Sequence, residues 1–147
     1  TLLALSAYPP YVAAGIRVEA VSDDLAEITV KMGLHGYNRN FFGTHFGGNL
    51  YSMCDPFFLF HVLMQLGDDY VCWDKGATVR FLKPGKGTVR ATFVMPRERI
   101  AEIRSLAAGR QKVEPTFTVQ VKDEAGEGVA EVEKLLYVKL KPGRPTN

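Results

Sequence analysis

The stretch between residues 48 and 66 limits most strongly what this chain can fold into, because it is apolar almost all round when read as a helix. A helix with one apolar stripe lies on a surface, whereas a helix without a polar face must be enclosed by other elements. Its large apolar members are Leu50, Met53, Phe57, Phe58, Leu59, Phe60, Val62, Leu63 and Met64. We therefore predict a long central helix with a curved sheet wrapped around it.

Segments in which apolar and polar residues alternate supply that sheet, and turn residues separate them. The alternating segments are 16–20, 26–32, 77–81, 89–95, 117–121 and 132–140. Two shorter helices are predicted, one opening at Pro9 and one at Pro96. The pattern indicates an α+β fold with about six antiparallel strands, in which residues 1–147 form one domain. The open edges of such a sheet favour a homo-oligomer, because a second copy of the chain would cover them.

Composition and charge exclude several functional classes. A formal net charge of +2 gives no reason to expect a nucleic-acid partner. The most apolar run, 57–66, is too short to span a bilayer, and the first residues lack the basic region of a secretory signal. Cys54 and Cys72 have neither the spacing of a metal site nor the number for a disulfide framework. We therefore expect reduced thiols in a cytoplasmic protein without a bound metal.

Asp55 and Pro56 interrupt the apolar stretch. Proline donates no backbone hydrogen bond, so the carbonyl of Ser52 should be freed and the helix should kink. A carboxylate in the most apolar part of the chain is costly unless something compensates its charge. We expect Asp55 to be buried at the kink, either as a functional acid or as a carboxylate hydrogen-bonded to backbone.

Gly47 and Gly48 stand where the helix should begin. Without side chains they let a ligand approach the backbone N–H groups closely, and free N–H groups at a helix start attract negative charge. The same pair would also permit a tight turn and close packing. A carboxylate about two turns further on favours hydrolysis of an acyl group as the chemistry.

Four residues of this region fall on a known pattern: Asn40, Gly47, Gly48 and Asp55, the last eight residues after the first glycine. The segment resembles the active-site loop and helix of hot-dog-fold acyl-CoA thioesterases of the phenylacetate-pathway type. Residues 81–85 also look like the strand-end turn of that family. The resemblance extends over most of the chain and implies the hot-dog fold.

One position departs from the family pattern. The His directly before the glycine pair is Phe46 here, and His45 lies one residue earlier. The resulting Phe-Gly-Gly form resembles a less characterised branch of the same superfamily. His45 would replace the missing His only if the loop were re-routed. The departure raises a second hypothesis, a protein that binds acyl-CoA or an acyl carrier without hydrolysing it.

The resemblance implies a role for each matching residue. Asp55 would act as general base for water or as nucleophile on the thioester carbonyl, and the Gly47 N–H would hold the oxyanion. Asn40 would hold the water or the substrate carbonyl, unless it only forms the turn. Gly48 and Phe46 would lie against the substrate.

Two further polar positions are candidates for substrate binding. Asp74 falls near the place where related thioesterases have a second polar residue, although an Asp-Lys pair at a strand start is usually solvated. Lys83, with Lys86 and Arg90, flanks a Pro-Gly turn and would meet the phosphates of coenzyme A, unless the cluster is simply solvated.

The leading hypothesis is therefore an acyl-CoA thioesterase that works as a homodimer or a dimer of dimers. It would need no cofactor beyond the coenzyme A of its substrate, no metal, and no nucleic-acid or membrane partner. Hydration of an enoyl thioester is a third hypothesis, but the chain lacks the His-plus-acid pair that such dehydratase relatives use.

Overall fold

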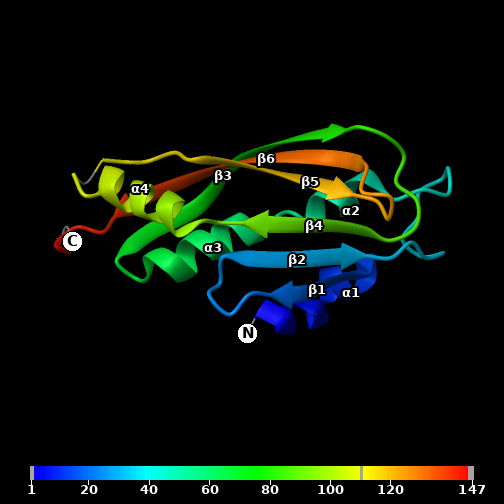
Figure 1. The fold of residues 1–147 in the computed structure, drawn as a ribbon, viewed down its shortest axis with the longest axis horizontal. Helices are drawn as coiled ribbons and strands as arrows, with labels where there is room; N and C mark the ends of the chain where they lie inside the picture. Colours follow the sequence, from blue (N-terminus) through cyan, green and yellow to red (C-terminus); the bar gives the residue numbers. More distant parts are fainter. Residues whose placement is uncertain (1, 110, 146–147) are drawn as a thin grey trace.

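The alternating segments form one six-stranded antiparallel sheet in the computed structural model, which describes residues 2–109 and 111–145. The strands lie in the order β1-β2-β4-β5-β6-β3 (Figure 1). Their bounds are β1 Ile16–Val21, β2 Glu27–Met32, β3 Tyr70–Phe81, β4 Val89–Val94, β5 Thr116–Lys122 and β6 Gly128–Leu140. The predicted α+β class and the antiparallel sheet are confirmed.

The two edges of the sheet differ. At one edge, the 3-10 helix η1 (Leu2–Ala7) and the helix α1 (Pro9–Ala14) pack against β1. Gly15 ends α1 at φ 74°, a left-handed conformation that glycine adopts without strain. At the other edge, β3 pairs with β6 alone within the described residues. One row of β3 backbone groups therefore lacks a neighbouring strand.

β3 is longer than its alternating pattern indicates. It begins at Tyr70, whereas the alternation is visible only from Ala77 onward. Its register against β6 shifts between Asp74 and Gly76. A bulge of this kind inserts one residue and breaks the period of two, so the pattern is visible on only one side of it.

The predicted central helix is present but divided in two. α2 spans Gly47–Ser52 and α3 spans Phe57–Leu66, so the expected kink at Pro56 is a complete break in the helix. The carbonyl of Ser52, which proline leaves without its usual helical donor, accepts a hydrogen bond from the Tyr11 hydroxyl at 3.1 Å.

One face of α3 carries the core of the protein. Phe57 and Phe58 are buried, and their rings lie 5.0 Å and 5.2 Å from the ring of Phe93 in β4. On the other face, Leu63 and Met64 are 37% and 38% exposed. The expectation of a fully enclosed helix is therefore wrong for a single chain, because one sheet covers one side of a helix only. Figure 1 shows α3 lying along one face of the sheet.

The last helix, α4 (Arg97–Ala107), follows Pro96 as the sequence predicts. It buries Ile100 and Ile103, which lie three residues apart and therefore share one side of the helix. Within the described part of the chain, no helix combines the length and the apolar character needed to cross a membrane.

Candidate functional site

The start of α2 presents the glycine pair. Phe46 precedes the helix in an extended conformation, with φ −63° and ψ 127°, and its side chain does not cap the first N–H groups. The Gly47 N–H is at the first helical position, where the helix offers no carbonyl to accept it. Aromatic rings approach both glycines: a Cβ would lie 3.0 Å from Phe81 Cζ at Gly47 and 2.6 Å from Phe46 Cε1 at Gly48. Close packing and a free N–H therefore coexist here.

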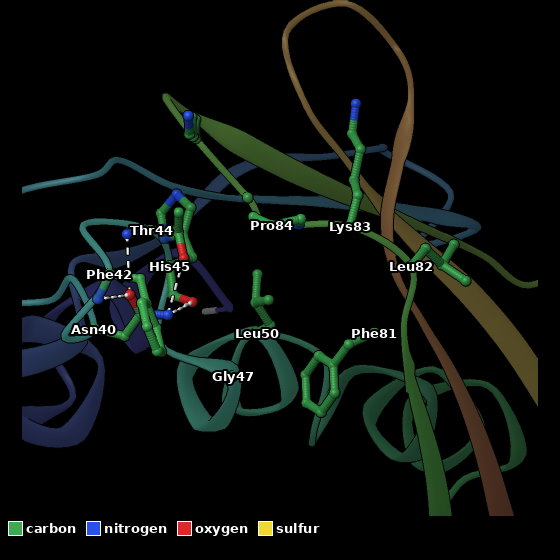
Figure 2. Close-up of a pocket in the computed structure, with 12 residues that line it drawn as sticks. Asn40, Phe42, Thr44, His45, Gly47, Leu50, Phe81, Leu82, Lys83 and Pro84 are labelled. Atoms are coloured by element: carbon green, nitrogen blue, oxygen red, sulfur yellow. Dashed lines mark hydrogen bonds between the residues drawn. The ribbon is translucent and has the colours of Figure 1, made fainter.

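A cavity of about 720 Å³ lies beside Gly47, between the loop before α2 and the turn after β3. Figure 2 shows Leu50 and Gly47 on its helical side and Pro84 opposite them. Its side chains are of two kinds, apolar (Phe42, Leu50, Phe81, Leu82, Pro84) and polar (Asn40, Thr44, His45, Lys83, Lys86). An apolar cleft with a few polar groups is typical of a small-molecule site.

Asn40 lines this cavity, but its side-chain amide makes hydrogen bonds within the loop itself. Its Nδ2 donates to Thr44 Oγ1 at 2.9 Å and to the His45 carbonyl at 3.3 Å. Its Oδ1 accepts from the backbone N–H groups of Phe42 and Thr44 at 2.9 Å and 3.0 Å. This side chain therefore folds the loop (Figure 2), which is the turn-forming role that an asparagine in a loop commonly takes.

His45 also lines the cavity and is almost completely buried. Its Nε2 lies 2.7 Å from the carbonyl of Gly87, which assigns the proton to Nε2. Its buried Nδ1 then remains an acceptor without a partner in residues 2–109 and 111–145. Burial chiefly lowers the pKa of His45, so the ring is neutral.

Lys83 lies at the cavity with its charge already paired. Its Nζ is 2.7 Å from Asp123 Oδ2 and also contacts the Glu127 carboxylate. The hydrogen bond with Asp123 contributes most to raising the pKa of Lys83. A ligand phosphate would have to compete with these two carboxylates. Arg90, the third cation of the sequence cluster, is bound by Glu19 at 2.8 Å.

Asp55 lies in the break between α2 and α3, and its side chain is 50% exposed. The expectation of a buried carboxylate is therefore wrong for the single chain. The helix ends before Asp55 and restarts after Pro56, so Asp55 lies outside both helices and half of its side chain is exposed. It is open to an approaching molecule.

Lys134 binds this carboxylate from the inner face of the sheet. Its Nζ lies 3.0 Å from Asp55 Oδ1 and 3.0 Å from Asp74 Oδ1, although the side chain of Lys134 is only 1% exposed. The contact with Asp74 is an ion pair that lacks hydrogen-bond geometry. The Tyr51 hydroxyl donates to Asp55 Oδ1 at 2.6 Å and accepts from Lys134 at 3.0 Å. We call Tyr51, Asp55, Asp74 and Lys134 the lysine cluster.

The charges in the lysine cluster follow from its contacts. Burial by itself lowers the pKa of Lys134, but its hydrogen bonds with Tyr51 and Asp55 and its ion pair with Asp74 outweigh burial and raise that pKa well above its usual range. Lys134 is therefore an ammonium. Burial also raises the pKa of Tyr51, with a further contribution from its bond to Asp55, so Tyr51 donates as a neutral phenol.

Sequence analysis missed Lys134, although the sequence carries a signal for it. Val132, Leu136 and Val138 alternate along β6 and are buried on the inner face of the sheet. Lys134 occupies the remaining inward position of that series. A cation at an inward position of a strand needs a compensating charge, so this break in the pattern predicts an acidic partner.

Asp55 and Gly47 lie at different places along the chain and do not line the same cavity. They are eight residues apart along a largely helical stretch, which corresponds to about 12 Å at the helical rise. A reacting carbonyl must lie about 3 Å from both groups. In agreement, Gly47 lines the cavity and Asp55 does not.

The other candidates occupy separate places. The Phe46 ring is half-exposed and lines a smaller hollow on the side of α1, away from Lys83. The carbonyl of Gly48 accepts a hydrogen bond from Ser52 Oγ at 2.9 Å. The described residues bring no three His, Cys, Asp or Glu side chains into an arrangement that could hold a metal ion.

Comparisons with known proteins agree on the fold. Residues 1–138 match a family described as Domain of unknown function (DUF4442). PA5026 of Pseudomonas aeruginosa, a protein of unknown function described as a probable thioesterase, superimposes with a TM-score of 0.81 at 25% identity, over 95% of this chain and 94% of its own. No curated protein matches the sequence.

Thioesterase HI1161 of Haemophilus influenzae superimposes with a TM-score of 0.68 at 13% identity, over 98% of this chain and 95% of its own. Thioesterase PA1618 of Pseudomonas aeruginosa, solved as a mutant, gives 0.66 at 16% identity, over 95% and 92%. At these identities the similarity concerns the fold, which is the hot-dog fold that the sequence predicts.

Proposed function

Because this chain belongs to the DUF4442 family and has the fold of the thioesterase superfamily, we propose that it is a thioester hydrolase in which Asp55 drives the attack of water. The observation that carries the proposal is the state of Asp55. It is a half-exposed carboxylate at a helix break, held on one side by Lys134 and Tyr51.

The proposed reaction needs two groups on opposite sides of the thioester carbonyl. One Asp55 oxygen takes a proton from water while the water oxygen bonds to the carbonyl carbon. The electron pair of the carbonyl moves to its oxygen, which accepts a hydrogen bond from the Gly47 N–H. When the intermediate collapses, the C–S bond breaks and the proton passes from Asp55 to the leaving thiolate. The products are a carboxylic acid and a thiol.

Two copies of the chain supply these groups in the proposal. Within one chain Asp55 does not line the cavity beside Gly47, so Asp55 of one subunit would face Gly47 of the other. The surfaces available for pairing are the open backbone of β3 and the uncovered face of α3, which exposes Leu63 and Met64. Open strand edges and exposed apolar faces are the usual sites of such pairing.

The substrate would be an acyl thioester of coenzyme A or of an acyl carrier, and the protein would need no other cofactor. The cavity beside Gly47 suits an elongated ligand, because apolar side chains line it on the Phe81 side and cations lie at the turn after β3. We expect Lys86 to be more available to a phosphate than Lys83, whose ammonium two carboxylates hold.

The first experiment measures thiol release from a panel of acyl-CoAs. Asp55→Asn keeps the shape of the side chain and removes its charge, and Asp68→Asn changes an exposed carboxylate in the turn after α3 as a matched control. We expect Asp55→Asn to lose turnover and Asp68→Asn to retain it. Equal turnover by Asp55→Asn and the wild type would remove Asp55 from the mechanism.

The second experiment tests whether the site crosses two subunits. Gly47→Pro removes the N–H of interest, and proline is tolerated at the first helical position. Its Cβ would lie 3.0 Å from Phe81 Cζ, so that ring must move slightly. The extended conformation of Phe46 suits a residue before proline. Refolding Asp55→Asn and Gly47→Pro chains together should restore about a quarter of wild-type turnover, because half of the dimers are mixed and each has one intact site. No recovery in the mixture, with each variant inactive alone and folded, contradicts the shared site.

A second candidate function is binding of a thioester without hydrolysis. Two observations favour it: Tyr51 and Lys134 already occupy one oxygen of Asp55, and Phe46 stands where the family pattern that the segment resembles has a His. Calorimetry with a non-hydrolysable thioester analogue separates the two functions. Tight binding of the analogue without turnover of any acyl-CoA in the panel would favour the binding protein.

A further inference from the structure

The two oxygens of Asp55 have different surroundings. Oδ1 accepts the Tyr51 hydroxyl at 2.6 Å and the Lys134 ammonium at 3.0 Å. Oδ2 has no hydrogen-bond or ion-pair partner within the described residues, and half of the side chain is exposed. Only Oδ2 therefore has free lone pairs on the open side of the carboxylate.

The group that makes this difference is itself rigidly held. Lys134 is 1% exposed, and its Nζ contacts Asp55, Asp74 and Tyr51, each at 3.0 Å. Its Nζ also lies 5.3 Å from the centre of the Tyr51 ring, within the range of a cation–π contact. A long side chain with these partners on α2, β3 and the helix break has little freedom to move.

We propose that Lys134 is a positioning residue that holds Oδ1 of Asp55, so that Oδ2 is the oxygen that takes the proton from the attacking water. Asp74 completes the arrangement by fixing the ammonium from β3. The inference rests on the proposed hydrolase and adds a residue that acts through Asp55. Lys134 acts through Asp55 and does not itself contact the substrate in this proposal, because its side chain is only 1% exposed.

The first test follows the carboxyl resonance of Asp55 by ¹³C NMR at one neutral pH in the full-length protein without substrate. Lys134→Met and Lys134→Gln remove the charge, Lys134→Arg keeps it, and Lys139→Met changes an exposed lysine of the same strand as control. We expect the Asp55 resonance to move in the Met and Gln variants, because Oδ1 then loses one of its two hydrogen-bond donors, and to stay near the wild-type position in the other two. An unchanged resonance in a folded Met or Gln variant overturns the proposal.

The second test measures kcat and KM with an acyl-CoA that the wild type hydrolyses. For Lys134→Met we expect kcat to fall about 100-fold, as for a misplaced reacting group, with KM little changed. Lys134→Arg should recover much of kcat. Identical kcat and KM values for Lys134→Met and Lys139→Met overturn the positioning role.

Failure of the inference and failure of the proposed function give different results. If Asp55→Asn hydrolyses thioesters as fast as the wild type, Asp55 is not the reacting group, and the proposed mechanism and this inference both fall. If Asp55→Asn is inactive while the Lys134 variants behave like Lys139→Met, only the inference falls.

Discussion

Lys134 is much more deeply buried than its two acidic partners, so removing the acids and removing the lysine should change the free energy of unfolding by different amounts. Asp55 and Asp74 have side chains that are 50% and 29% exposed, whereas the side chain of Lys134 is 1% exposed. The combined change Asp55→Asn and Asp74→Asn therefore leaves an ammonium in the core without a counter-charge. Breaking a buried pair in this way typically costs about 3–5 kcal/mol, and we expect the free energy of unfolding to fall by about that amount.

The opposite change should cost far less. Lys134→Met places an apolar side chain of similar length on the inner face of β6, and the two carboxylates can still be hydrated at the surface. Replacing a buried charge by a hydrophobic residue of similar volume is often neutral or stabilising. We expect the free energy of unfolding of Lys134→Met to lie within about 1 kcal/mol of the wild-type value.

The pH dependence distinguishes this explanation from a general packing defect. In the wild type the pKa of Lys134 is raised. Its stabilising contribution is therefore fully present below the pKa of the lysine in the unfolded chain, and it is lost only as pH rises through the pKa of the lysine in the folded protein. In the double variant burial and the hydrogen bond to Tyr51 remain, and burial, which has the larger effect of the two, lowers the pKa of Lys134 in the folded chain. Between about pH 8 and 10 the unfolded chain then binds more protons, so stability should rise with pH, by at most about 1.4 kcal/mol per unit.

Urea denaturation followed by circular dichroism measures these quantities, at one fixed protein concentration because dissociation of an oligomer would add to the result. Asp68→Asn and Lys139→Met serve as surface controls. The reasoning is refuted if Lys134→Met loses as much stability as the double variant. It is also refuted if the stability of the double variant does not depend on pH in this range.

Other consequences of the structure are open to simpler measurements. Burial chiefly lowers the pKa of both His45 and His61, so the unfolded chain binds protons first as pH falls below about 6.5. Thermal denaturation should therefore show stability decreasing below that pH, by at most about 1.4 kcal/mol per pH unit and per histidine. A flat profile of stability against pH would contradict this expectation. Tyr11→Phe removes the hydrogen bond to Ser52 and should lower the free energy of unfolding by about 0.5–1.5 kcal/mol in urea; a gain in stability would show that this bond does not support the helix break. Phe57→Ala empties a fully buried position and should cost about 3–5 kcal/mol in the same assay, whereas a cost near zero would mean that the aromatic core repacks.

Elements with a clear period were predictable from the sequence. Five of the six strands lie close to their alternating segments, because the alternation reflects one buried face and needs no distant information. The first half of β3 was not predictable from the alternation, because the bulge between Asp74 and Gly76 inserts one residue and reverses which side chains face the core beyond it. A kink at Pro56 was predictable because proline acts on its own helix, but its extent was not, since the structure divides the helix in two.

The candidate site was predictable only where it is local. The glycine pair at a helix start and the freed Ser52 carbonyl follow from residues close together in the chain. The exposure of Asp55 was not predictable, because the same apolar neighbours would bury it if the helix continued without a break. Lys83 likewise appeared free in the sequence, and its partner Asp123 comes from another turn.

The sequence by itself determined the class of fold, an irregularity of the helix at Pro56 and the glycine pair at the helix start, because neighbouring residues specify these through period, steric limits and missing donors. The tertiary structure alone decided which charges meet. Lys134 lies 79 residues from Asp55 along the chain, and strand register against the helix break sets their distance. An ion pair between two such segments depends on the angstrom-scale placement of backbones, which no local pattern encodes.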